Sequence, residues 1–198
     1  MAESTGITHE ISQSRTAELT ARAAIFSTDL AQLGKFTPVG EDDLPESYAS
    51  LLAHHNHMTV TLEAYWESLV AVRVVQERLD GAVYARQSLL ARHSDGAVVQ
   101  YGIMSIDLTD LPPRVRQAIE TASGPLGRVL IKNNLLRDVE LLALWHIVAG
   151  EELARNLGVP AGRVVYGRSA AIHLSGARAV DLLEIVTDQP TVPPAESP

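Results

Sequence analysis

A glutamate in the middle of an apolar segment near the end of the chain most constrains the fold. Residues 178–187 have the pattern of a strand, and strand side chains alternate between two faces, so Glu184 shares a face with Val180, Leu182 and Val186. The composition of that face predicts an interior position. A buried ionised carboxylate costs free energy unless it is paired, protonated or used in chemistry. Glu184 therefore indicates either a structural ion pair in the core or a functional group in a pocket, and alternation does not separate the two.

Two arginines also interrupt segments that otherwise read as strands. Arg86 lies in the run 83–91, and Arg73 interrupts the β-branched run 70–75. Together with Glu184, these residues predict a pocket that binds an anion and moves a proton. The alternative is that the strands have a solvated face, or that the arginines form ion pairs with the glutamate.

The remaining patterns predict an α+β fold built on a single antiparallel β-sheet with helices packed around it. We expect strands over residues 59–65, 70–76, 83–91, 98–106, 162–174 and 178–187. We expect helices over residues 14–30, from residue 44 onward, and over residues 110–122 and 128–133. The pattern of residues 137–146 fits either a helix or a strand. Asp80-Gly81, Asp95-Gly96 and Ser175-Gly176 are turn signals that join neighbouring strands as hairpins.

The length of 198 residues favours one domain with a single core. We expect this domain to cover residues 17–188, between a polar, mobile N-terminal segment over 1–16 and a proline-rich tail over 189–198.

Composition excludes several classes of function. The formal net charge is −8 and Lys and Arg form no stripe, so non-specific binding to nucleic acid or to an anionic membrane lacks its electrostatic basis. The chain has no cysteine, which excludes disulfides, thiolate metal sites and cysteine nucleophiles. No apolar run approaches the roughly 20 residues that span a bilayer, and the N-terminus does not have the pattern of a signal peptide. We expect a cytoplasmic protein whose partner is a small anionic or cyclic molecule rather than nucleic acid or membrane.

Motifs for common cofactors are not evident. The glycines form neither a phosphate loop nor a dinucleotide fingerprint, and no serine lies in a nucleophile elbow. His54 and His57 are spaced to share a metal ion on a helix, but a suitable third ligand is not evident nearby, so surface histidines are the expectation.

Six short motifs follow one another along the chain: His57-Met58-Thr59 with Leu62-Glu63, Tyr84-Ala85-Arg86, Pro125-Leu126-Gly127-Arg128, Leu136-Arg137-Asp138, Tyr166-Gly167-Arg168, and Leu174-Ser175-Gly176 leading to Leu183-Glu184. In order and spacing they resemble the chorismate pyruvate-lyase (4-hydroxybenzoate synthase) family and its chorismate lyase-like relatives, over about residues 57–187.

This resemblance implies a buried ligand cavity and a carbon–oxygen lyase that eliminates pyruvate from chorismate, or from a close relative, to leave a hydroxybenzoate. It also implies that Arg86 holds the ring carboxylate, that Glu184 is the catalytic acid or base, and that backbone amides at Met58 and Leu126 help to close the pocket. Aromatisation drives such a reaction, so no cofactor is expected. A buried glutamate can be tuned to exchange a proton near neutral pH.

One departure from the family leaves the substrate open. The family places a further arginine on the strand 98–106, where this chain has Ile103. Arg73, Lys132 or Arg168 would have to supply that cation; otherwise a less anionic substrate is expected.

Two alternatives follow. The first is a cyclase or eliminase of secondary metabolism with the same fold. The second is a non-catalytic small-molecule-binding domain, since effector-binding domains of some bacterial transcription regulators share this fold. The acidic charge, and the lack of a recognisable DNA-binding helix pair, weigh against the second alternative.

Overall fold

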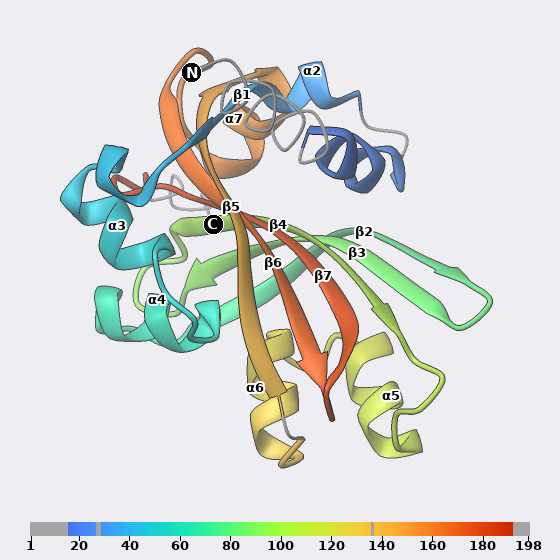
Figure 1. The fold of residues 1–198 in the computed structure, drawn as a ribbon. Coiled ribbons are helices and arrows are strands. Elements are labelled where there is room, and N and C mark those ends of the chain that lie inside the picture. Colours follow the sequence, from blue (N-terminus) through green and yellow to red (C-terminus); the bar gives the residue numbers. More distant parts are fainter. Residues whose placement is uncertain (1–15, 27–28, 136, 192–198) are drawn as a thin grey trace, which may run out of the picture.

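Seven strands form one antiparallel sheet in the order β1-β5-β6-β7-β4-β3-β2 (Figure 1). The computed structural model describes residues 16–26, 29–135 and 137–191. The strands are β1 (Gly34–Val39), β2 (Val70–Asp80), β3 (Val83–Arg92), β4 (Val98–Asp107), β5 (Arg137–Ala149), β6 (Val164–Leu174) and β7 (Ala177–Val186). The predicted α+β class with a single antiparallel sheet is confirmed.

Tight turns set the register of the two hairpins that matter most for the site. Gly81 (φ 60°) connects β2 to β3, and Gly176 (φ 86°) connects β6 to β7. Glycine adopts positive φ without the steric cost that a Cβ imposes, so these turns are favourable where the sequence places them.

Helices cover both faces of the sheet. One face packs against a helix over residues 16–24, α2 (Leu30–Leu33) and α7 (Glu151–Leu157); the other packs against α3 (Glu46–Leu52), α4 (Met58–Trp66), α5 (Pro113–Glu120) and α6 (Leu126–Lys132) (Figure 1). Alternation along β4 supplies both cores, since Tyr101 and Ile103 pack in the first and Met104 in the second.

On the face of α3–α6 the apolar residues form two separate clusters. One lies around α5 and α6 and includes Val115, Ile119 and Leu130; the other lies around α3 and α4 and includes Leu51 and Leu62. The space between these two clusters is where the site lies.

Several element predictions were wrong or incomplete. The strand expected over 59–65 is helix α4, because Met58 and Leu62 lie one helical turn apart and both are buried; this packing overrides the β-propensity of Thr59, Val60 and Thr61. β1 and α7 were not predicted, and residues 137–146, which fitted either helix or strand, belong to β5.

The predicted N-terminal helix is shorter than expected, because its described part ends at residue 24 and α2 is a separate helix. Most of the predicted mobile segment (1–16) and most of the predicted tail (189–198) lie outside the described residues. Among the described helices, none combines the length and apolar character needed to cross a membrane.

Candidate functional site

A pocket opens between α4, α6 and the central strands. Its empty volume is about 570 Å³, counted with the space at its open mouth. Apolar side chains form most of its walls: Met58, Leu90, Met104, Leu126, Val139, Ile172 and Leu182. A smaller polar set also lines it: His57, Thr59, Arg86, Ser88, Gln100, Arg168 and Glu184.

The floor of the pocket is a row of residues that face one another across four strands. Ser88 on β3 pairs with Gly102 on β4, which pairs with Glu184 on β7, which pairs with Arg168 on β6. Gly102 has no side chain, so the floor is lowest between Ser88 and Glu184. A Cβ added at Gly102 would lie 3.3 Å from the Gln100 amide nitrogen, which shows how closely the walls approach this point.

Arg86 is a buried cation whose hydrogen-bonding capacity is largely unused. Only 3% of the residue is exposed, and its Nε and Nη1 atoms have no hydrogen-bond partner within the described part of the chain. Burial lowers the pKa of the guanidinium, while Tyr84 and Glu77 raise it. The Tyr84 hydroxyl donates to Glu77 Oε2 at 2.9 Å, so this carboxylate is already engaged. A buried cation of this kind is costly to the fold and suited to an anionic ligand.

Glu184 is held by Arg168. Arg168 Nε donates to Glu184 Oε2 at 2.7 Å, and both residues are buried. The other carboxylate oxygen, Oε1, accepts no hydrogen bond from the described residues. Of the two interpretations that the sequence left open for Glu184, the geometry matches the structural ion pair, and it places that pair in the pocket floor.

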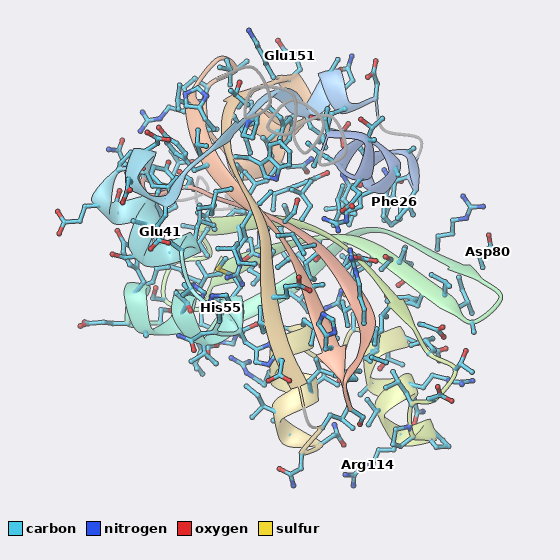
Figure 2. The ribbon with its side chains drawn as sticks, viewed as in Figure 1. Phe26, Glu41, His55, Asp80, Arg114 and Glu151 are labelled. Carbon is cyan, nitrogen blue, oxygen red and sulfur yellow. The ribbon has the colours of Figure 1, made fainter. Side chains whose placement is uncertain are left out.

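Arg168 also fastens the connection between α3 and α4 to the sheet. Its Nη1 donates to the His54 carbonyl oxygen at 2.9 Å and lies 3.2 Å from His54 Nδ1, and its Nη2 donates to the Asn56 carbonyl oxygen at 3.3 Å. This connection carries His55, which Figure 2 labels beside α4, and leads into His57 and Met58 of the pocket wall. A single buried arginine therefore joins the pocket floor to the segment that closes the pocket.

His54 is positioned to be neutral. The Asn56 amide donates to His54 Nδ1 at 3.1 Å, and Nε2 lies 2.9 Å from the Leu51 carbonyl oxygen, which fits a tautomer with the proton on Nε2. Burial lowers the pKa of His54, and the charge of Arg168 lowers it further.

We expect the free energy of unfolding to fall as pH is lowered through and below about 6.5, the ordinary pKa of histidine, because the unfolded chain then takes up a proton that folded His54 resists. His54→Gln should flatten this dependence in urea titrations between pH 8 and pH 5.5. His55→Gln, at an exposed neighbouring position, is the control and should leave the slope unchanged. An equal slope in wild type and His54→Gln would contradict this role.

The structure brings together five of the seven site residues predicted from sequence. Glu184, Arg86, Met58, Leu126 and Arg168 all line the pocket.

The other two predicted site residues lie elsewhere. Arg73 is exposed on the edge strand β2, with Nη2 3.4 Å from the Gly96 carbonyl oxygen, and Lys132 is exposed at the end of α6. Neither supplies a second cation to the pocket. Ile103, where that cation was expected, packs with Leu183 and Trp145 in the core on the opposite face of the sheet.

Ser88, Gln100 and Gly102 were not predicted as site residues. Gln100 is 6% exposed, and its Oε1 has no hydrogen-bond partner among the described residues. Alternation along residues 98–106 already places Gln100, Gly102 and Met104 on one face. A polar amide and a glycine on the interior face of an apolar strand were the sequence features that could have indicated these site residues.

Comparison with known proteins finds similarity in structure only. No protein-family model and no curated protein sequence matches the chain. The effector domain of PhnF from Mycobacterium smegmatis has a TM-score of 0.50 and 12% identity, over 77% of this chain and 92% of that chain. Longer PhnF from the same organism has a TM-score of 0.48 and 10% identity, over 67% of this chain and 64% of that chain. A GntR-family transcriptional regulator from Enterococcus faecalis V583 has a TM-score of 0.45 and 10% identity, over 64% of this chain and 100% of that chain.

These findings correct the functional expectation from sequence. The solved structure that reaches a TM-score of 0.50 is an effector domain, not a lyase, so the predicted membership of the chorismate pyruvate-lyase family and the predicted pyruvate elimination were wrong. The same finding overturns the expectation of an enzyme, and with it the role of Glu184 as catalytic acid or base. The motifs that carried the resemblance are short, and a shared fold does not identify the chemistry of a site.

Proposed function

We propose that this chain is a non-catalytic small-molecule-binding domain whose pocket receives an anionic group on Arg86. The observation that carries the proposal is the buried guanidinium with two unpaired nitrogens at the wall of a pocket whose lining is mostly apolar. An anion that accepts from Nε and Nη1 would remove the cost of leaving these donors unsatisfied. Arg168 is less suited to this task, because its nitrogens already donate to Glu184, His54 and Asn56.

A regulatory role is the second part of the proposal. A solved structure with a similar fold is an effector domain, which supports a domain that senses a ligand rather than one that converts it. Arg168 could transmit the presence of a ligand, because it contacts Glu184 in the pocket floor and also the segment between α3 and α4.

The experiment that tests the proposal is a thermal-shift screen of small carboxylates and phosphate esters against their uncharged amides and alcohols. A ligand present at about 100 times its Kd stabilises the folded state by about 2.7 kcal/mol, a readily measured shift. We expect one or more acids to raise the Tm while the matched neutral compounds do not. Equal shifts by acids and by their neutral analogues would contradict an anion site.

Gly102→Leu is expected to abolish these ligand-induced shifts, because the new side chain would occupy the lowest part of the pocket floor. The variant should still fold, since the backbone of Gly102 does not require positive φ and the nearest obstacle is the end of the Gln100 side chain. Gly124→Ala is the control, because a Cβ there meets nothing within 4 Å. Undiminished ligand shifts in Gly102→Leu would place the binding site elsewhere.

A further inference from the structure

Resting on the proposed function, we propose that the ligand is a hydroxylated monoanion: one acidic group at the Arg86 end and at least one hydroxyl at the end formed by Glu184 and Gln100. This narrows the ligand to small hydroxy acids and disfavours diacids.

Charge at the pocket wall sets the first condition. The ionisable residues among its described lining are Arg86, Arg168, Glu184 and His57. Arg168 and Glu184 neutralise each other at 2.7 Å. Apart from His57, the lining then carries one uncompensated positive charge, that of Arg86. A second anionic group on the ligand would lie near the Glu184 carboxylate without a cation of its own, which is unfavourable in a site of low dielectric.

Unused acceptors set the second condition. Glu184 Oε1 accepts no hydrogen bond from the described residues, and Gln100 Oε1 is buried without a partner. The two residues are neighbours around Gly102, because Gly102 pairs with Glu184 and the Gln100 amide lies over the glycine. A cluster of acceptors is satisfied by a ligand group that donates, and a neutral hydroxyl donates without altering the charge balance.

Sheet geometry sets the third condition, the spacing. Arg86 lies on β3 and Glu184 on β7, with β4 between them, so their backbones are separated by roughly 10 Å across the sheet. Arg86 pairs with Met104, two residues further along β4 than Gly102, which adds a displacement of roughly 7 Å along the strands. Both side chains reach into the pocket between these points. Met104 and Leu182 lie along this line, so the middle of the ligand contacts apolar surface.

Matched compounds test this inference. Isothermal titration calorimetry would compare straight-chain monocarboxylates of four to seven carbons with their ω-hydroxy derivatives and with the diacids of equal length. The titrations are done at pH 8, where an imidazole is ordinarily uncharged. At the chain length that fits, we expect the hydroxy acid to bind about tenfold more tightly than the parent acid, and the diacid to bind more weakly than the hydroxy acid. Gln100→Met should erase the advantage of the hydroxyl while acid binding persists. Gln76→Met, at an exposed position on β2, is the control.

Two kinds of failure are distinguishable. If acids bind and Arg86→Met abolishes that binding, but the hydroxyl adds less than twofold at every chain length or the diacid binds tightest, the hydroxy-acid inference is overturned and the anion site stands. If no acid shows binding that depends on Arg86, the proposed function fails and the inference fails with it.

Discussion

Arg86→Met is expected to weaken binding of anionic ligands by about 100-fold. The loss corresponds to about 2.7 kcal/mol, the size of one or two hydrogen bonds to a charged group in a buried site. Methionine retains most of the length and the apolar stem of the side chain, so the shape of the pocket wall is kept.

The same substitution should leave the free energy of unfolding unchanged or raise it by about 1 kcal/mol. Folding buries the Arg86 guanidinium and leaves two of its nitrogens without partners, and removing the charge removes that cost. Opposite effects on binding and stability mark a residue kept for function.

Titration of a ligand identified by the screen, together with urea unfolding of the ligand-free protein, measures both quantities. Arg73→Met is the matched control, because Arg73 also interrupts a strand but is exposed; it should change neither quantity. Full binding by Arg86→Met, or a loss of more than about 2 kcal/mol in stability, would show that Arg86 serves the fold instead.

Arg168→Met is expected to be the most destabilising substitution in the site, by about 3–5 kcal/mol. The change would leave the Glu184 carboxylate buried without its cation, and it would remove the donors that satisfy the carbonyl groups of His54 and Asn56. The expected cost is that of breaking a buried ion pair by removing one partner.

Pairing this change with Glu184→Leu provides the decisive comparison. The double variant should recover part of the lost stability, because the uncompensated carboxylate is then absent. Arg163→Met is the control, since Arg163 is 40% exposed and its ion pair with Asp188 spans 4.0 Å; it should cost less than about 1 kcal/mol. If Arg168→Met cost equally little in urea unfolding, or if the double variant were no more stable than Arg168→Met, the ion pair would not support the fold as described.

Alternation of side chains was sufficient to predict the most important part of the site. Glu184 and Arg86 stand out because a charged residue on an interior strand face is costly, and both line the pocket. Turn signals at Gly81 and Gly176 predicted the hairpins that bring β3 and β7 into the sheet. These are local patterns, so they can be read without knowledge of the fold.

Pairing across the sheet could not be predicted in the same way. Arg73 and Arg86 look alike in sequence, but β2 is an edge strand and β3 is interior, so one arginine is solvated and the other is buried. The ion pair between Arg168 and Glu184 depends on the register of β6 and β7, which also decides that Glu184 has a structural partner. Helix α4 was missed because long-range packing of Met58 and Leu62 outweighs local propensity.

The most direct test of the central claim is equilibrium dialysis of the wild-type protein and Arg86→Met against a mixture of small metabolites, with mass spectrometry of both compartments. We predict that the wild-type protein retains one or a few anionic compounds, that Arg86→Met does not retain them, and that they are released chemically unchanged. Retention that is equal in both proteins, or conversion of the retained compound into a new product, would contradict a non-catalytic anion-binding pocket at Arg86.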